Sequence, residues 1–365
     1  MVNRRSVILG GAALAGLPRL ASADPATVPV TVNAAPGFDA AALTAIGQAF
    51  LQSPDNLHGL LVERHGQTAL EVYRKGRDQP IGDLTGHDTN FDADTLHDLR
   101  GISRAITVLL WGIAQGEGKT PSLDTVVLDL YPKLAKFKSD GRDAIRVRHL
   151  LNMSAALQWS EEGSKSDALG LTWNTDPLGF IFNRPMTGTP GNVFNDCSGC
   201  TFVLADLLSQ HVGMSVVDYA NTRLFGPLGI TGFEWRKDIL GRVRVYDGLR
   251  LKPRDLLHIG RMVAWGGQWQ GYAIVPSDLI AASMKPLINT HQPLIAPQYG
   301  YGWWSGPGQA QGHPMRWQAA VGGGANRLFL APDLDLVVVT TAGNYDVVDD
   351  SVQRVFERIV GAVRG

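Results

Sequence analysis

The chain has 365 residues, of which 44% are hydrophobic and 18% are charged, and its formal net charge is −1. This composition is typical of a folded chain with one large domain or two, and it is too apolar for a disordered protein. The near-zero charge, with no later run of Lys and Arg, argues against nucleic acid or an acidic membrane surface as a partner.

The first 23 residues are typical of a bacterial export signal. Arg4-Arg5 precedes an apolar stretch from Val7 to Leu17, and Ala21-Ser22-Ala23 offers small residues for cleavage. The Arg pair followed by Ser-Val-Ile-Leu is typical of a twin-arginine signal. Because the apolar stretch is too short to span a bilayer, we expect cleavage after Ala23 rather than an uncleaved anchor. The mature protein is then periplasmic or secreted, without stable membrane insertion.

Further along, apolar residues recur at helical spacing from Asp39 to Gln52, and the Asp can cap this helix. Strand-like runs at His58–Glu63 and Thr68–Arg74 flank His65-Gly66, which predicts an antiparallel hairpin. The middle of the chain is mainly helical, with helices expected at Ile102–Gln115, Val147–Met153, Thr201–His211, Val216–Leu224 and Arg254–Ala264. Strand patterns return at Gly302–Ser305, Trp317–Val321, Arg327–Ala331 and Leu336–Thr341, before a last amphipathic helix at Val352–Val363.

Strands at both ends around a helical insert predict an α/β (α+β) fold, in which one antiparallel sheet is built from both ends of the chain and flanked by helices. We expect residues 24–95 and 290–365 to form this sheet lobe, and residues 96–289 to form a mainly helical lobe of the same unit. A cleft between two such lobes is the expected place for a ligand.

Several segments, in the right order between about residues 40 and 350, resemble the serine β-lactamase and penicillin-binding-protein superfamily, and within it the branch of esterases and short-oligomer amidases. They are DADTLHDLR at 92–100, HLLNMSAALQW at 149–159, PGNVFNDCSG at 190–199, LFGPLGI at 224–230, LRLKPRD at 249–255 and LDLVVVTTAGNY at 334–345. This resemblance implies a β-lactamase-like fold and a hydrolase ancestry.

The resemblance also shows which working groups have changed. The family's S-x-x-K motif places a nucleophilic Ser and a basic Lys on one helix face, whereas this chain reads Gly101-Ile102-Ser103-Arg104. Gly101 has no side chain to attack with, and Arg104 stays protonated. Ser103 is turned by about 200° around the helix from Gly101, so it is a poor replacement. We therefore expect no activated serine.

The other two motifs are altered as well. Where the family has Y-x-(N/S), this chain has Asp196-Cys197-Ser198, and the third motif reads Gly322-Gly323-Gly324. The resemblance implies that Arg104 and Asp196 lie close together, either as a rebuilt functional pair or as charges that only neutralise each other. It also implies that the backbone N–H groups of the oxyanion hole survive. The candidate binding residues are accordingly Gly101, Ser198, Trp159, Gly323 and Gly324, with glycines expected to widen the floor of the pocket.

Three interpretations remain open. The protein is a pseudoenzyme that binds a ligand in the old cleft, an enzyme repurposed around Arg104 and Asp196, or a weak serine-independent hydrolase of esters or amides in which Asp196 positions a water. In each, the expected partner is a small anionic or carbonyl-containing molecule, because guanidinium and oxyanion donors favour such groups.

Cysteine and histidine add little chemistry in this sequence. Cys197 and Cys200 form a C-x-x-C just before a helix, but the surrounding pattern is not thioredoxin-like, so a disulfide or two packed thiols are expected rather than a redox centre. His97 is expected to be a hydrogen-bonded support. The nine His show no ligand spacing, and we expect neither a metal nor another cofactor.

Overall fold

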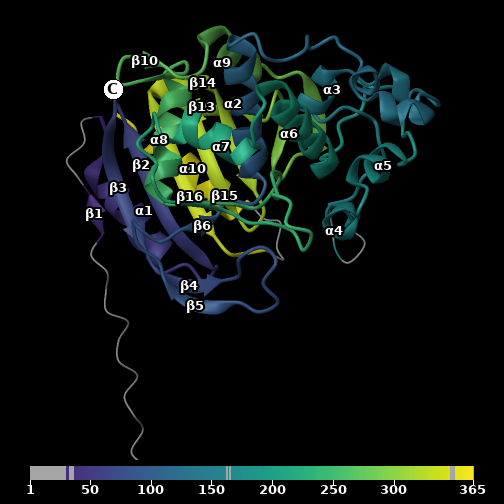
Figure 1. Cartoon of the computed structure of the whole chain (residues 1–365). Coiled ribbons are helices and arrows are strands. Elements are labelled where there is room, and N and C mark those ends of the chain that lie inside the picture. The colour runs from purple at the N-terminus through teal and green to yellow at the C-terminus, as the bar shows by residue number, and fades with distance from the viewer. Residues whose placement is uncertain (1–29, 33–36, 162, 164–165, 346–349, 365) are drawn as a thin grey trace, which may run out of the picture.

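The computed structural model describes residues 30–32, 37–161, 163, 166–345 and 350–364, so the predicted export signal lies outside the described residues. The centre of the molecule is a nine-stranded antiparallel sheet (Figure 1). Its strands are β1 (Thr31–Val32), β2 (Leu57–Arg64), β3 (Gln67–Tyr73), β11 (Ile288–Gln292), β12 (Ala296–Tyr299), β13 (Trp304–Ala310), β14 (His313–Gly322), β15 (Asn326–Ala331) and β16 (Leu336–Ala342). In the sheet they are ordered β1-β3-β2-β16-β15-β14-β13-β12-β11. The pairing of β2 with β16 joins the two ends of the chain, as predicted.

Helices cover both faces of this sheet. On β15, Leu328 lies under Gly260 of α8 (Pro253–Ala264), while Phe329 stacks on Phe356 of α10 (Ser351–Gly361) with ring centroids 4.4 Å apart. Because neighbouring residues of a strand point to opposite faces, α8 and α10 lie on opposite sides of the sheet. Next to α10 lies α1 (Ala40–Leu51), whose first turn is capped by the Asp39 carboxylate, 3.0 Å from the N–H of Ala42.

The middle of the chain supplies the helical lobe. It contains α2 (Ile102–Gly116), α3 (Val147–Leu151), α4 (Asp167–Trp173), α5 (Pro177–Phe182), α6 (Ser198–Val212), α7 (Val216–Ala220) and α9 (Ser277–Met284). Short strands lie outside the main sheet at β4 (Lys75–Asp78), β5 (His87–Asn90), β6 (His97–Asp98), β7 (Phe233–Trp235), β8 (Leu249–Leu251), β9 (Gln268–Trp269) and β10 (Tyr272–Ala273). The central helix is α6, which contacts α2, α3, α4 and α7.

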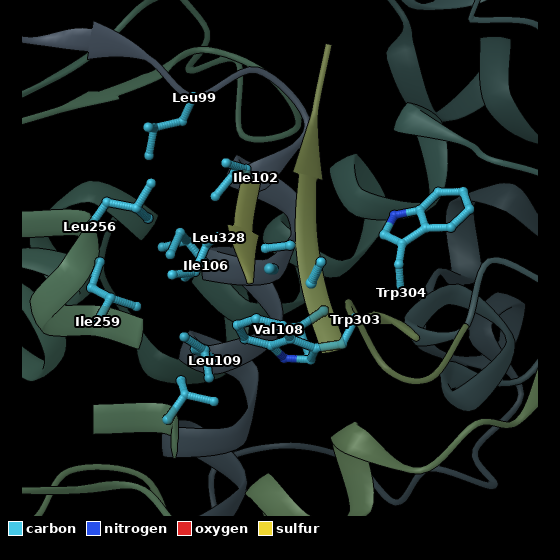
Figure 2. Packing of buried hydrophobic residues seen from close by; sticks show 14 of the residues in the cluster. Leu99, Ile102, Ile106, Val108, Leu109, Leu256, Ile259, Trp303, Trp304 and Leu328 are labelled. Carbon is cyan, nitrogen blue, oxygen red and sulfur yellow. The ribbon is translucent and has the colours of Figure 1, made fainter. Parts of the chain in front are cut away.

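The helix α2 links the two lobes, because it contacts both α6 and the sheet strands β14 and β15. Figure 2 shows Ile106 and Leu109 of α2 lying towards Ile259 of α8, with Leu328 beside them. All four side chains are buried, as are most residues of α2. The start of α2 is therefore held firmly against the sheet.

The remaining differences from the sequence patterns are local. The pair β11 and β12, with the sequences INTHQ and APQY, lacks the alternation of apolar and polar residues that identifies a strand. Both strands form at the edge of the sheet through their pairing with each other and with β13. Within the described residues no single helix is long and apolar enough to cross a membrane, and only α6 taken with residues 216–225, bent by 77°, meets those criteria of length and composition.

Candidate active-site cleft

A cleft of about 490 Å³ lies where the start of α2, the end of β14 and the helical lobe meet. Its charged lining is made of four arginines and three carboxylates, namely Arg100, Arg104, Arg244, Arg327, Glu161, Asp196 and Asp247. Aromatic walls come from Tyr299, Trp304 and Tyr345. Five of the seven candidate catalytic and binding residues line this cleft, namely Gly101, Arg104, Asp196, Gly323 and Gly324.

The expected contact between Arg104 and Asp196 is present. Arg104 lies in the first turn of α2, and its Nη1 donates to Oδ1 of Asp196, which directly precedes the N-terminus of α6. The segment before α6 is fixed by Asn195, whose side-chain amide donates to the carbonyls of Leu157 and Trp159. The packing of α2 against α6 thus brings together two charges that lie far apart in the sequence.

A third charged residue, Glu161, joins this pair. Its Oε1 lies 3.2 Å from Nη2 of Arg104 and also accepts hydrogen bonds from the backbone N–H of Ser198 and from Nε1 of Trp159, at 2.6 and 2.9 Å. Its Oε2 accepts from the Ser198 hydroxyl at 2.9 Å. Glu161 stands in no recognised motif, so it was not among the residues predicted for the site.

Two predicted binding residues, Ser198 and Trp159, are placed behind the cleft rather than in its lining. Ser198 is fully buried, and its hydroxyl also accepts from Nη2 of Arg104 at 3.0 Å. Trp159 is 6% exposed and packs edge-on against Phe180. Both contact Glu161, so in this structure they support the charged cluster instead of facing a ligand.

The charged cluster changes the acid–base properties of its members. Burial alone would lower the pKa of Arg104, but the carboxylates of Asp196 and Glu161 raise it above its ordinary value. Arg104 is therefore a permanent cation and not a base. Burial raises the pKa of Asp196 against the attraction of Arg104, and the nearby charge of Glu161 adds to that rise. The Asp196 side chain keeps 33% of its surface exposed, so its carboxyl is open to the cleft.

At Gly101, where the resemblance places the family's nucleophile, the space for a side chain is closed by backbone. A Cβ atom at Gly101 would lie 2.6 Å from the carbonyl oxygen of Val321 on β14, and one at Gly322 would lie 2.1 Å from the carbonyl oxygen of Leu99. The expectation that these glycines widen the pocket floor is therefore wrong for Gly101 and Gly322, because they let two backbone segments approach each other. Among Gly101 and the three glycines of the third motif, only Gly323 has open space around the position of its missing Cβ.

We expect Gly101→Ala to lower the free energy of unfolding by about 1–3 kcal/mol, the usual cost of forcing a group into a packed region. Gly101 has φ −58°, a conformation that alanine adopts readily, so without the clash this substitution would stabilise the protein. The matched control is Gly323→Ala, which we expect to change stability by less than about 0.5 kcal/mol. Urea unfolding of both variants measures the difference, and equal stabilities would show that β14 moves away from α2 without cost.

Asn326 sets the conformation of the third motif. Its Nδ2 donates to the carbonyls of Gly323 and Ala342, at 2.7 and 3.1 Å, and its Oδ1 accepts from the N–H of Ala342. Gly324 has φ +82°, which favours glycine, and a Cβ there would meet the Tyr345 ring at 2.5 Å. Within the described residues, the N–H groups of Gly101 and Gly323 donate to no backbone carbonyl, and both residues line the cleft.

The other arginines of the cleft are held in place by neighbours. Arg244 makes two hydrogen bonds to the carboxylate of Asp247, at 2.9 and 2.5 Å. Arg100 lies 4.0 Å from the centre of the Tyr345 ring, and its Nε is 3.3 Å from Asp98. Arg327 donates to the carbonyl of Gly322 at 2.9 Å. These contacts fix the guanidinium groups around the cleft before any ligand binds.

A buried pair of histidines joins β2, which carries His58, to β6, the short strand before α2 that carries His97. Nδ1 of His58 and Nε2 of His97 are 2.5 Å apart, and Nδ1 of His97 is 2.9 Å from the carbonyl of Asp98. This confirms that His97 is a hydrogen-bonded support. Burial lowers the pKa of His58 to about 2, with help from His97 and Arg74, and burial lowers the pKa of His97 to about 3.

Cys197 and Cys200 are two buried free thiols. The sulfur of Cys197 accepts a hydrogen bond from the N–H of Cys200 at 3.3 Å and so caps α6. Burial, together with Cys200, raises the pKa of the Cys197 thiol well above its ordinary value. A thiol in this state is a poor nucleophile, which fits packed thiols rather than a redox centre.

Comparisons with known proteins agree on one family. The profile of the Beta-lactamase family matches residues 59–361. A D-aminopeptidase from Brucella anthropi is 28% identical over 207 residues, which cover 53% of this chain and 36% of that protein. The chain thus matches only about a third of the length of this relative.

Solved structures show the same fold at low sequence identity. A family VIII carboxylesterase superposes with a TM-score of 0.70 at 13% identity, covering 91% of this chain and 99% of the other. A D-stereospecific amidohydrolase from Streptomyces sp. superposes with a TM-score of 0.66 at 14% identity, covering 88% and 98%.

Proposed function

Because the chain belongs to the β-lactamase family, a family of hydrolases, we propose that it uses the family's cleft to bind a small anionic ligand without forming a covalent acyl-enzyme. The observation that carries this proposal is the closed nucleophile position beside an open cleft. At residue 101 there is neither a side chain nor space for one, while the neighbouring cleft keeps about 490 Å³ and four guanidinium groups. We also propose, from the signal predicted in residues 1–23, that the protein acts in the periplasm or outside the cell.

The polar groups of the cleft suit an oxyanion. Guanidinium groups recognise carboxylates and phosphates through several N–H donors held in one plane. The N–H groups of Gly101 and Gly323 add two neutral donors near Arg104. The likeness to a D-aminopeptidase and a D-stereospecific amidohydrolase supports a ligand that carries an amide carbonyl in addition to its anionic group.

The exposed carboxyl of Asp196 favours a second candidate, an enzyme that works without a serine. Only Oδ1 of Asp196 contacts Arg104, and its raised pKa brings proton exchange closer to neutral pH. Such a carboxyl can take a proton from a bound water or from the ligand itself. This candidate includes weak hydrolysis of esters or amides by a water that Asp196 positions.

A ligand panel and an active-serine probe test the proposal together. We expect small carboxylates and phosphates to raise the melting temperature of the purified protein, while the matched amides, such as benzamide against benzoate, leave it unchanged. Intact-mass analysis after treatment with a fluorophosphonate or a penicillin is expected to show no added mass. Stoichiometric labelling, or an absence of any response to anions, would overturn the proposal. Ester hydrolysis that Asp196→Asn abolishes would favour the second candidate.

A further inference from the structure

The helix α4, whose Leu169 lines the cleft, and a turn tied to its C-terminal end carry exposed apolar side chains. These two segments hold four of the eleven large apolar residues that are exposed in the described chain, namely Leu169 at 47%, Trp173 at 60%, Ile239 at 60% and Leu240 at 45% exposed. We refer to these four as the apolar track. Leu169 is itself part of the cleft lining, so the track begins inside the cleft.

The first half of the track lies on α4. Leu169 and Trp173 are four residues apart and therefore share one face of the helix, about 6 Å apart along its axis. The opposite face of α4 buries Ala168 and Leu171 in the helical lobe. A surface helix normally carries polar residues on its outer face, so an apolar outer face that starts in the cleft calls for a partner.

The second half of the track is a rigid turn that the rest of the protein holds against α4. Arg242 donates to the carbonyls of Asn174 and Leu171, at 2.7 and 2.9 Å, and so ties the turn to the C-terminal end of the helix. Asp238 closes the turn by accepting from the N–H groups of Leu240 and Arg242, both at 2.9 Å. These hydrogen bonds fix the turn, so Ile239 and Leu240 stay exposed to solvent.

Resting on the proposed function, we infer that the ligand is amphiphilic: its anionic head occupies the arginine-lined cleft, and its apolar chain leaves past Leu169 to lie on Trp173, Ile239 and Leu240. Continuity with the cleft supports a single small molecule over a membrane or a second copy of the chain. A ligand with no apolar part would leave the track uncovered, at a cost in exposed apolar surface.

The test compares butyrate with octanoate, kept below its micelle concentration, by isothermal titration calorimetry. We expect octanoate to bind the parent protein about tenfold more tightly than butyrate. This ratio is smaller than full burial of the four extra methylene groups would give, because the track is open to solvent on one side. In the double variant Trp173→Ser and Ile239→Ser the preference is expected to fall below about twofold, with butyrate affinity unchanged. The control is Tyr272→Ser, since Tyr272 is 75% exposed on β10, outside the cleft lining.

The outcomes separate this inference from the proposed function. If neither carboxylate binds, the proposed function fails. If both bind the parent equally, or if the preference survives the double variant, the amphiphilic ligand alone is overturned. The parent protein is also tested for binding to phosphatidylcholine vesicles and for dimerisation by sedimentation. If either is seen, is lost in the double variant and is not inhibited by octanoate, the track belongs to a membrane or to a second copy of the chain. That result would also overturn the amphiphilic ligand. Unchanged melting temperatures without ligand show that the variants are folded.

Discussion

Arg104→Met is expected to lower the free energy of unfolding by about 3–5 kcal/mol, because it leaves two carboxylates without their cation. The Arg104 side chain is only 11% exposed, and it contacts Asp196, Glu161 and Ser198. Asp196→Leu is expected to cost less, about 1–3 kcal/mol, since Arg104 keeps Glu161 as a counterion. Urea denaturation at pH 7.5 measures both effects.

The double variant Arg104→Met with Asp196→Leu completes the cycle. Glu161 then keeps three neutral donors, the Ser198 N–H, the Ser198 hydroxyl and Nε1 of Trp159. We expect the double variant to be more stable than Arg104→Met alone, with a coupling energy of about 1–3 kcal/mol. The matched control is Arg354→Met with Asp350→Leu, an exposed pair on α10 for which we expect a coupling below about 1 kcal/mol.

Ligand response distinguishes a working pair from a structural one. If Arg104 and Asp196 serve the ligand, anions that raise the melting temperature of the parent have no effect on the double variant. If the pair only neutralises charge, the double variant keeps its response to anions. Additive effects of the two single substitutions would contradict the charged cluster described above.

The second large effect is a loss of stability in mild acid, which we expect from the buried histidines. The folded-state pKa values of His58 and His97, about 2 and 3, lie below the unfolded value of about 6.5. Between these limits the unfolded chain binds more protons, so stability is full above about pH 6.5 and falls as the pH decreases. Each histidine contributes a slope of up to about 1.4 kcal/mol per pH unit, so this pair alone contributes a loss of about 3–4 kcal/mol between pH 7.5 and 5.

The variant His97→Gln should remove about half of this pH dependence, whatever its stability at pH 7.5. The control is His65→Gln, because the side chain of His65 is 50% exposed on the turn between β2 and β3 and does not take part in the buried pair. Urea unfolding at a series of pH values gives the slopes. A stability that does not change between pH 7.5 and 5 would mean that the folded pair keeps one extra proton. With that proton, both histidines could donate to their acceptors, Oδ1 of Asn56 and the carbonyl of Asp98, and still share a hydrogen bond with each other.

The parts of the site that were predictable from the sequence are those that stand in family motifs. The resemblance assigned Gly101, Arg104 and Asp196 to motif positions, and it predicted the contact between the two charges, which is present. The absence of a nucleophile stays a prediction. Glu161 stands outside every motif, and its role arises from tertiary contacts with Ser198 and Arg104. Periodicity predicted the main strands and helices because their buried faces are regular.

The close approach of the β14 backbone to Gly101 was not predictable, because it too depends on tertiary structure. A glycine can leave empty space in a cleft, or it can let a neighbouring backbone segment approach closely. Only the path of β14 decides which of these occurs at Gly101. The apolar track was not predictable either, since the turn that carries Ile239 is tied to the end of α4 by hydrogen bonds of Arg242 to backbone carbonyls, and these carry no sequence signal.

The pairing of β2 with β16 also constrains the order in which the protein folds. Val62 and Val338 face each other across this pair, although about three quarters of the chain separates them. Every residue of β2 is buried in the folded protein, and β3 can pair with only one of its edges, so the other edge stays unpaired until β16 has been synthesised. Pairings between distant segments form slowly, and a long-lived unpaired strand edge is prone to aggregation. We therefore expect the β16-facing edge of β2 to be a site of wrong pairing while the chain is being made.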